Sequence, residues 1–342
     1  MNVFVTCING VSGTASIAQR KVARVARELG FDIMGSYKIP EFIDDDNELN
    51  HRMDGIISSL RQRDVVIFQF PSWSGLRYEE FLCNHIKAYQ NAKLIIFVED
   101  VEALQMDPDR MTLPYCVRLF NKADGLILPS RRMFKVLKEA GLQLTEGQMT
   151  YQPIWDYPTD IQVTSHQFIK RMIFTGDPAR FPFLQEYKGT TPIDLFSLSD
   201  ISRQNGQNVN WHGYKDADEL FWENAKGGFG LVWCDDTYFE QYYCMNQPYK
   251  LGVFLAEGLP VIMRKGSHQE AFIRDNNLGI IAETLDEADQ IIQNMSEEEY
   301  RGYLAAVCKV QDLSVKGFYT RKTLIDAIIK ACENTSQTNI AR

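Results

Sequence analysis

The sequence predicts an α/β protein made of two Rossmann-like domains. Short apolar segments, typical of buried parallel strands, alternate with helical segments along most of the chain. A Pro- and aromatic-rich segment at residues 151–159 interrupts this alternation, which then begins again. The length of 342 residues also corresponds to roughly two domains of ordinary size. We therefore expect one domain over residues 1–155 and a second over residues 156–315.

Strands and helices alternate through the first domain. We expect strands at residues 2–6, 31–37, 65–70, 94–98 and 125–128, and helices at residues 16–29, 49–61 and 78–89, with further helices ending at Asn121 and beginning near Arg131. In a parallel sheet, ligands bind beyond the carboxyl ends of the strands. This places residues 71–74, Glu99–Asp100 and residues 129–130 on the ligand side.

The first strand leads into a Gly/Ser-rich loop at residues 8–14, as in many nucleotide-binding sheets. The spacing is not GxGxxG, so it does not indicate a dinucleotide site. Gly10 and Gly13 either allow a ligand to approach the backbone or simply allow a tight turn, and both interpretations remain open. Gly13 and Ser16, at the start of the following helix, are candidate donor-binding residues.

The second domain repeats the pattern. Strands are expected at residues 172–175, 193–196, 209–212, 229–233, 261–263 and 279–282, and helices at residues 217–225, 251–257, 285–295 and 297–310. A last helix at residues 319–331 follows Gly317, and residues 316–342 are expected to complete the first domain.

The most informative stretch is residues 246–266, NQPYKLGVFLAEGLPVIMRKG. Lys250 stands just before a short helix, which ends at Gly258, and a buried strand follows. The start of a helix attracts a phosphate through its free N–H groups and its dipole, and a lysine adds a full charge. The alternative is an ordinary helix–turn–strand unit with a surface lysine.

Composition narrows the class of protein. The net charge of −9 argues against a general nucleic-acid or membrane-surface binder. No apolar run approaches the ~20 residues of a membrane span, and the first residues do not resemble a signal peptide. The seven cysteines show no CxxC spacing, so we expect reduced thiols in a cytoplasmic protein. The five histidines show no metal-ligand spacing.

Several segments resemble the GT-B glycosyltransferases, which have two Rossmann-like domains facing a cleft and a last helix that returns to the first domain. The residues that carry the resemblance are Lys250-Leu251, Phe254-Leu255-Ala256, Gly258, Pro260-Val261 and the segment Ala123-Asp124-Gly-Leu-Ile-Leu-Pro-Ser130. In this class the nucleotide-sugar site lies in the second domain.

A closer resemblance spans nearly the whole chain. It is carried by Ile8-Asn-Gly, Arg63-Asp-Val-Val-Ile-Phe-Gln-Phe-Pro, Trp155-Asp156, Asp177-Pro-Ala-Arg180-Phe, Gly227-Gly-Phe-Gly-Leu-Val-Trp233 and Lys316-Gly-Phe318. These segments look like the glucosyltransferases that extend O-linked GlcNAc on serine-rich-repeat adhesins of Gram-positive bacteria. The resemblance implies a UDP-sugar donor, usually UDP-glucose, a GlcNAc-modified Ser/Thr acceptor and a homo-oligomer, often a tetramer.

The chain departs from these patterns at two positions. Val253 stands where many retaining GT-B enzymes carry a glutamate for the ribose, so retaining chemistry does not follow from the motif. The adhesin family usually has His-Asp where this chain has Glu99-Asp100. A histidine can act as a base near neutral pH, whereas a glutamate needs a suitable pKa.

Glycosyl transfer requires neutralisation of the charge that develops on the leaving diphosphate. Arg180 and Lys250 fit this role, because both stand on the ligand side of the second sheet. Arg180 could instead be a turn residue paired with Asp177. Tyr214 is a candidate for contact with the uracil, with core packing as the alternative, and Gly252 is a further candidate in the donor-binding segment.

We expect no metal ion in this chemistry. Asp107-Pro-Asp109 has the DxD spacing, but its proline and the lack of a preceding strand indicate a turn. Asp235-Asp236 follows a strand, yet no third ligand is evident.

The acceptor and the base are assigned to the first domain. Trp73 could stack on an acceptor sugar ring, or simply pack under a loop. Asp100 and Glu99 are candidates for the general base, with Asp100 preferred because the resembling family keeps the aspartate. Capping of the turn at residues 101–104 is the alternative role. Two other functions remain open for the chain: a nucleotide-sugar epimerase, and a non-catalytic glycosyltransferase-like partner subunit.

Overall fold

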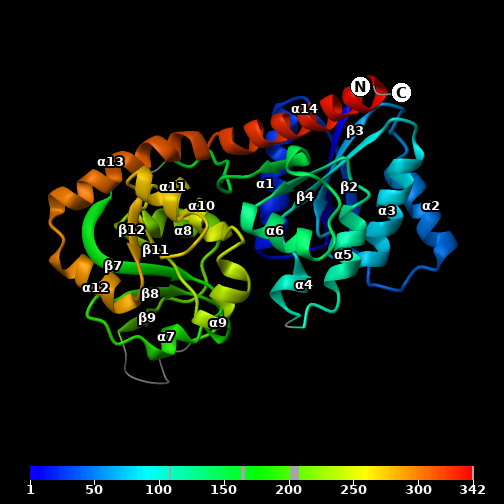
Figure 1. The fold of residues 1–342 in the computed structure, drawn as a ribbon. Coiled ribbons are helices and arrows are strands. Elements are labelled where there is room, and N and C mark those ends of the chain that lie inside the picture. Colours follow the sequence, from blue (N-terminus) through cyan, green and yellow to red (C-terminus); the bar gives the residue numbers. More distant parts are fainter. Residues whose placement is uncertain (108, 163–165, 201–207, 341–342) are drawn as a thin grey trace. The chain divides into compact units, whose positions relative to one another are not determined.

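The computed structural model describes residues 1–107, 109–162, 166–200 and 208–340, with side chains to residue 333. The chain forms two compact units (Figure 1). Unit 1 comprises Met1–Pro153 and Gly317–Arg342, and unit 2 comprises Ile154–Lys316. The first boundary lies between residues 153 and 154 rather than after residue 155. The reason is local, because the Trp155 indole donates to the Gln247 carbonyl oxygen (3.2 Å) within unit 2.

Unit 1 is built on a parallel sheet with strand order β2-β1-β3-β4-β5-β6 among the described residues. The strands are β1 (Val3–Asn9), β2 (Asp32–Tyr37), β3 (Val65–Phe70), β4 (Lys93–Val98), β5 (Gly125–Leu128) and β6 (Met149–Tyr151). The helices are α1 (Thr14–Glu28), α2 (Asp46–Ile56), α3 (Leu76–Ala88), α4 (Glu102–Gln105), α5 (Leu113–Phe120), α6 (Arg131–Glu139) and α14 (Phe318–Ile340).

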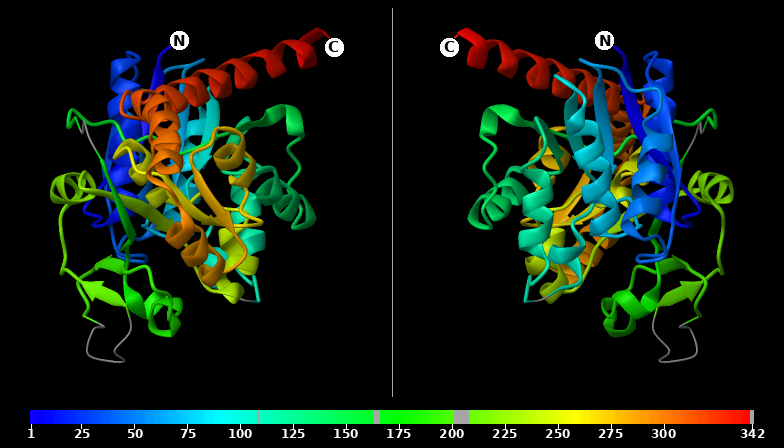
Figure 2. Two further views of the ribbon diagram at one scale, coloured as in Figure 1. Left: turned by 90° about the vertical axis from the view of Figure 1, so that its left-hand side faces the viewer. Right: turned by 90° about the vertical axis from the view of Figure 1, so that its right-hand side faces the viewer.

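Helices pack on the sheet of unit 1, which explains its apolar central strands. Every residue of β3 is buried, and so are the last five of β4. The last helix, α14, contacts α1 and the strands β4, β5 and β6, and the views in Figure 2 show it running along this unit. Strand order reverses between β1 and β3, and such a switch point is where open α/β sheets bind ligands.

Unit 2 has a second parallel sheet, with strand order β12-β11-β10-β7-β8-β9 among the described residues. Its strands are β7 (Gln167–Thr175), β8 (Ile193–Phe196), β9 (Val209–Trp211), β10 (Gly227–Val232), β11 (Val261–Arg264) and β12 (Gly279–Ala282). Its helical elements are η2 (Pro178–Arg180), α7 (Phe183–Glu186), α8 (Ala217–Asn224), α9 (Asp236–Tyr238), η3 (Phe239–Tyr243), α10 (Tyr249–Ala256), α11 (Glu270–Asp275), α12 (Leu285–Asn294) and α13 (Glu297–Ser314).

The switch point of unit 2 lies between β7 and β10. Helix α10 packs directly on β10, because a Cβ atom on Gly230 would lie only 2.3 Å from the ring of Phe254. This close approach keeps the start of α10 near the carboxyl ends of β7 and β10, so the segment singled out in the sequence lies at the switch point.

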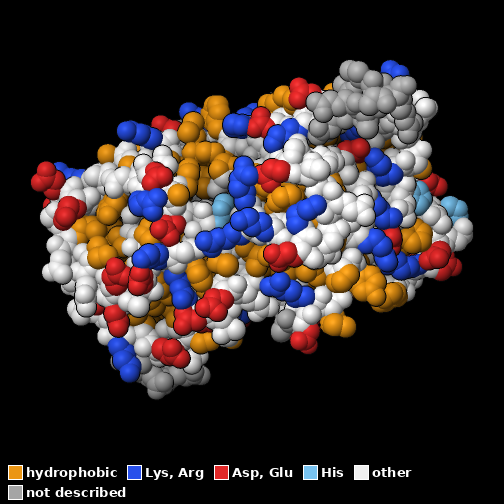
Figure 3. All heavy atoms as spheres, in the orientation of Figure 1, with side chains coloured by type: hydrophobic (Ala, Val, Ile, Leu, Met, Phe, Trp, Pro, Cys, Tyr) orange, Lys and Arg blue, Asp and Glu red, His pale blue; other side chains and the backbone are white. Residues whose placement is uncertain are grey.

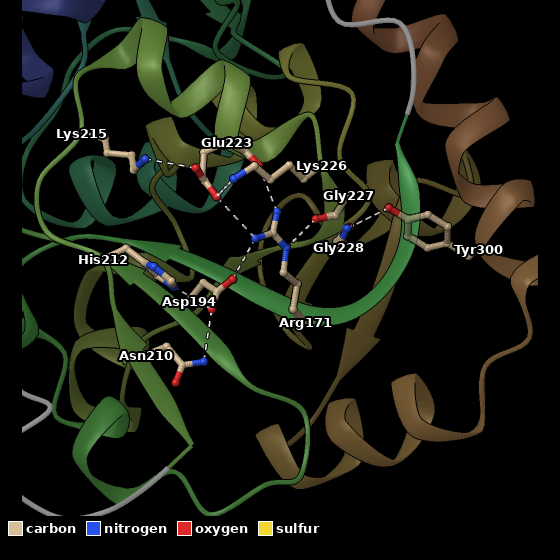
Figure 4. Close-up of polar contacts among 10 residues, drawn as sticks. All are labelled: Arg171, Asp194, Asn210, His212, Lys215, Glu223, Lys226, Gly227, Gly228 and Tyr300. Carbon is tan, nitrogen blue, oxygen red and sulfur yellow. Dashed lines mark hydrogen bonds and ion pairs between the residues drawn. The ribbon is translucent and has the colours of Figure 1, made fainter.

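A buried ionic network ties four strands of unit 2 to α8 (Figure 4). The Arg171 guanidinium donates to the Asp194 carboxylate (2.8 Å) and to the carbonyl oxygens of Gly227 (2.8 Å) and Glu223 (3.0 Å). The network continues to His212, Asn210, Lys215 and Lys226. Because its charges are paired and hydrogen-bonded, it fixes the relative positions of these elements.

The predicted α/β class and alternating order are confirmed, and the differences include one unexpected strand and the ends of elements. The edge strand β6 was not expected, and only its last residue, Tyr151, overlaps residues 151–159, which we expected to be an irregular link. Lys250 is the second residue of α10 and therefore lies inside the first turn rather than before it. The last helix extends beyond the expected end at residue 331.

The surface carries charges of both signs. On the face shown in Figure 3, basic and acidic side chains are interspersed and hydrophobic side chains form small groups. In the described part of the chain, no helix combines the length and the apolar character needed to cross a membrane.

Candidate donor and acceptor sites

Two cationic side chains lie near the switch point of unit 2 and interact electrostatically. Arg180 ends the short helix η2, which follows β7, and Lys250 lies on the first turn of α10, which follows β10. The Arg180 guanidinium is exposed and is close enough to lower the pKa of Lys250. The structure therefore brings together two residues that lie 70 positions apart and that the sequence assigned to one site.

Lys250 holds its ammonium group in an aromatic environment. Its Nζ atom lies 4.0 Å from the centre of the Phe174 ring and 4.4 Å from that of Phe181, within the range of cation–π attraction. The nitrogen is buried and has no hydrogen-bond partner among the described residues. Burial lowers the pKa of Lys250 to about 7, and Arg180 acts in the same direction against an opposing effect of Cys234.

This arrangement would suit an anionic ligand, as predicted for Lys250 and Arg180 from the sequence. Two like charges repel each other, and a buried ammonium without a hydrogen bond costs free energy unless a partner arrives. An anionic ligand would relieve both costs. Gly176 lies beside the lysine, and a side chain there would crowd the site. A Cβ atom at this position would lie 3.1 Å from Phe181 and 3.4 Å from Lys250 Nζ, and the φ of +152° also favours glycine.

Arg180 could instead be a turn residue paired with Asp177. The described residues show no ion pair between the two side chains. The Asp177 carboxylate instead accepts a hydrogen bond from the Ala179 N–H (3.1 Å), which caps η2. Arg180 is thus positioned by a capped turn and keeps its own donors for other partners.

The other donor candidates of unit 2 lie in different surroundings. Tyr214 follows β9 and is 64% exposed, whereas the neighbouring Trp211 donates to the Ser197 carbonyl oxygen (3.0 Å). Gly252 is buried, and a Cβ atom there would lie 2.0 Å from the Trp155 carbonyl oxygen. Close packing against Trp155 therefore explains why residue 252 is a glycine. The roles of Gly252 and Tyr214 in donor binding stay predictions.

The carboxylates considered as metal ligands have other partners. Asp235 caps the next helix through the Tyr238 N–H (3.0 Å), and Asp236 forms an ion pair with Arg264. Asp107 accepts from the Thr112 N–H (2.9 Å) and hydroxyl (3.0 Å), and residue 108 lies outside the described residues. Within the described ranges, no group of three or more His, Cys, Asp or Glu residues is placed to bind a metal ion.

In unit 1, the candidate base residues follow β4 at the ligand edge of the sheet. The Glu99 N–H donates to the Phe70 carbonyl oxygen (2.9 Å), so Glu99 lies beside the end of β3. Its side chain is buried, and its Oε1 atom has no hydrogen-bond partner among the described residues. Asp100 is half-buried.

The pKa of Glu99 is shifted by its surroundings. Burial raises the pKa of Glu99 well above its ordinary value, and the negative charge of Asp100 raises it further, with a hydrogen bond from Gln19 opposing. Burial and the neighbouring charge therefore favour the protonated form of Glu99. The choice between Asp100 and Glu99 as the general base stays a prediction.

The Gly/Ser-rich loop leads into α1 as expected. Gly13 is the N-cap of this helix with φ +79°, and a Cβ atom there would meet no atom within 4 Å. Gly13 therefore serves the turn by its backbone conformation and leaves open space above the helix. The Ser16 hydroxyl is buried without a hydrogen-bond partner among the described residues.

Trp73 follows β3 and lines a cavity of about 820 Å³ that lies wholly within unit 1. The same cavity is lined by charged residues that the sequence did not single out, Lys38, Glu41, Glu79 and Glu102. Sequence reasoning also missed Phe174 and Phe181, although the aromatic run around Arg180 was a signal. A glutamate inside an amphipathic helix, such as Glu79, gives no comparable signal.

Two family models match the chain. The N-terminal domain of the glucosyltransferase 3-like family matches residues 2–154, and the C-terminal domain of the same family matches residues 172–327. These matches follow the division into unit 1 and unit 2.

Similar proteins and structures agree with the family models. The chain is 35% identical to glucosyltransferase 3 of Streptococcus gordonii over 335 residues, 96% of this chain and 99% of that protein. It is 34% identical to glucosyltransferase 3 of Streptococcus parasanguinis over 333 residues, 97% and 99% of the two chains. The solved structure of Anabaena HepE in complex with UDP superposes with a TM-score of 0.62 at 11% identity, covering 96% and 99% of the two chains. These similarities confirm the predicted GT-B fold.

Proposed function

We propose that this chain, which belongs to the glucosyltransferase 3-like family and is therefore a glycosyltransferase, transfers glucose from UDP-glucose to GlcNAc O-linked to Ser or Thr. The acceptor protein in this proposal is a serine-rich-repeat adhesin, as the sequence resemblance implies. The observation that carries the donor assignment is the buried, unpartnered ammonium of Lys250 beside Arg180. The UDP bound by the similar HepE structure supports a uridine nucleotide as the ligand.

The two cations have a direct role in this reaction. When the bond between glucose and the diphosphate breaks, negative charge develops on the diphosphate oxygens. Lys250 and Arg180 would stabilise that charge more strongly in the transition state than in the bound donor. Because Lys250 is held between two aromatic rings, it needs little reorganisation as the charge develops.

Unit 1 supplies the candidate base. In an inverting reaction, the Asp100 carboxylate would take the proton from the acceptor hydroxyl as it attacks the glucose carbon. Burial and the charge of Asp100 raise the pKa of the neighbouring Glu99 and favour its protonated form. No metal ion is needed for either step, because the cations are supplied by the side chains of unit 2.

The proposal also covers the cellular location and the oligomeric state of the enzyme. We expect a cytoplasmic homo-oligomer, and a tetramer in particular, as the resemblance implies. Light scattering on the purified chain would test the oligomeric state.

The test of the function is a donor screen on a GlcNAc-modified Ser-rich peptide. UDP-glucose, UDP-galactose and UDP-GlcNAc are each supplied, and mass spectrometry records the addition of a sugar. We expect transfer from UDP-glucose to the modified peptide and none to the unmodified peptide. No transfer from any donor, despite saturable UDP binding, would contradict the proposal.

Two other functions give different results in the same experiments. An epimerase would convert UDP-GlcNAc to its epimer without an acceptor, which NMR detects directly. A non-catalytic partner subunit would show no saturable UDP binding by calorimetry. The pair of cations at Lys250 and Arg180 argues against the second of these functions.

A further inference from the structure

The loop that follows β3 is held in a constrained shape at the mouth of the unit 1 cavity. Trp73 adopts φ +60°, a left-handed conformation that is unusual for a bulky residue. Its indole nitrogen is also buried without a hydrogen-bond partner among the described residues. Both features cost free energy, and such costs are typically found where a loop serves binding.

A chain of hydrogen bonds fixes this loop from both sides. The Glu79 carboxyl accepts from the Ser72 N–H (2.6 Å) and from the Ser72 hydroxyl (2.9 Å). The Ser72 oxygen accepts from the Ser74 N–H (3.3 Å), and the Ser74 oxygen accepts from the Ile39 N–H (3.1 Å). The chain joins α3 to the loop after β3 and then to the loop after β2, so Trp73 lies between two anchored serines.

Glu79 is an unusual anchor because it is 2% exposed and, among the described residues, no cation is recorded as its partner. Burial raises its pKa to about 8, against the opposing effect of the two Ser72 hydrogen bonds. Near neutral pH the carboxyl group therefore carries a proton and acts as a neutral acceptor. A glutamine at this position would accept the same two hydrogen bonds.

The rest of the cavity is lined by polar groups suited to hydroxyls. Glu102 is half-buried, and burial raises its pKa while the nearby Lys38 opposes this and Glu41 adds to it. Carboxyl and ammonium groups at such a rim can accept and donate hydrogen bonds to a sugar, while an indole face suits the C–H face of its ring. The cavity volume of about 820 Å³ is within the range of small-molecule sites.

We propose that this cavity binds the saccharide ring of the acceptor against Trp73, and that Glu79 is the positioning residue that holds the loop for it. The inference rests on the proposed function, since it names where the acceptor sugar binds in that reaction. It adds a residue, Glu79, that belongs to the cavity lining but is only 2% exposed, and whose proposed role is to act through Ser72 and Trp73.

The test compares two acceptors and four variants. The acceptors are a GlcNAc-modified Ser-rich peptide and a phenyl glycoside of GlcNAc, which lacks the peptide. The variants are Trp73→Ala, Trp73→Phe, Glu79→Leu and Glu79→Gln, and UDP calorimetry reports whether each keeps a folded donor site. We expect Trp73→Ala and Glu79→Leu to raise the KM of both acceptors about tenfold, with the KM of UDP-glucose and kcat nearly unchanged; tenfold corresponds to about 1.4 kcal/mol.

The conservative variants separate positioning from general stability. Trp73→Phe retains an aromatic face and Glu79→Gln retains the acceptor for Ser72, so both should keep the acceptor KM within about threefold of the wild type, or about 0.7 kcal/mol. Unchanged acceptor KM in Trp73→Ala would overturn the proposal. A rise confined to the peptide acceptor would also overturn it, because the cavity would then bind the peptide rather than the sugar.

Failure of the proposed function would give a different result from failure of the acceptor-site inference. If the wild type transfers no sugar to either acceptor, the proposed function fails. Saturation-transfer NMR with the GlcNAc-modified peptide then tests whether the cavity binds the sugar. Saturation of the sugar protons by the wild type, lost in Trp73→Ala, would support the inference. The absence of saturation with the wild type would overturn it.

Discussion

The ammonium nitrogen of Lys250 lies 4.0 Å from the centre of the Phe174 ring and has no hydrogen-bond partner among the described residues. The aromatic ring attracts the charge, but it does not replace the hydrogen bonds that the ammonium group loses on leaving water. We therefore expect the site to destabilise the fold in the absence of a ligand. The relationship between these two residues leads to predictions about stability, pH and binding.

Replacing Lys250 with methionine should stabilise the unliganded protein. The variant keeps a flexible apolar chain between the two rings and removes a buried charge without a partner, so we expect a gain of about 1–3 kcal/mol at pH 6. Thermal and urea unfolding measure this gain. The exposed Lys188 is a matched control, since Lys188→Met should leave stability nearly unchanged. Destabilisation by Lys250→Met would show that the lysine has a structural role.

The binding of UDP should weaken as the pH rises above about 7, the pKa of Lys250 in the unliganded protein. Only the protonated lysine attracts the diphosphate, so each pH unit above this value should cost about tenfold in affinity. Calorimetry between pH 6 and pH 9 measures the slope, and Lys250→Met should abolish it. A wild-type affinity that does not change over this range would contradict the assignment.

Stability should depend on pH in the opposite sense. The pKa of Lys250 is lowered in the folded protein from 10.5, so the unfolded chain binds more protons between about pH 7 and pH 10.5. Stability from this group therefore rises with pH across that window and is flat below it. The difference between wild type and Lys250→Met in urea unfolding should shrink over the same range.

Asp100→Asn should reduce turnover by about a hundredfold or more, the usual effect of losing a general base. Glu99→Gln should keep most of the activity, because burial favours the neutral form of Glu99, which an amide resembles. Both variants should bind UDP as the wild type does. The reverse result, an active Asp100→Asn and an inactive Glu99→Gln, would make the glutamate the base.

Arg171→Met should destabilise unit 2 by about 3–5 kcal/mol, because it leaves the buried Asp194 carboxylate without its cation. The exposed ion pair between Arg301 and Glu297 provides the control, since Arg301→Met should have little effect. Urea unfolding measures both. Equal and small effects of the two variants would show that the network in Figure 4 does not contribute to stability.

Removal of divalent metal ions should leave transfer unchanged. We expect Arg180 and Lys250 to supply the positive charge for the diphosphate, so that the reaction would need no bridging metal. Initial rates measured with excess EDTA and with added Mg²⁺ or Mn²⁺ should agree within about twofold, or about 0.4 kcal/mol. Loss of activity in EDTA that returns on addition of a metal ion would contradict this prediction.

The sequence predicted the fold well because the central strands of both sheets are buried on both faces. Strands such as β3 and β10 then appear as continuous apolar runs, which are easy to recognise between helices. The edge strand β6 was missed because it has only three residues and precedes a proline-containing segment. Its pairing with β5 depends on the rest of the sheet rather than on its own residues.

The candidate sites were predicted only in part. The placement of Arg180 and Lys250 at strand ends followed from the order of elements, but the burial of Lys250 depends on Phe174 and Phe181, which tertiary packing brings to it. The anchoring role of Glu79 depends on a loop that folds back onto α3. Such contacts between distant or irregular segments leave no periodic pattern in the sequence.

The most direct test of the central claim compares UDP with uridine in calorimetric titrations. If Lys250 and Arg180 bind the diphosphate, the wild type should bind UDP at least a hundredfold more tightly than uridine, a difference of about 2.7 kcal/mol. Lys250→Met and Arg180→Ala should each lose most of this preference while their weak affinity for uridine stays the same. A preference for UDP that survives both substitutions would contradict the claim.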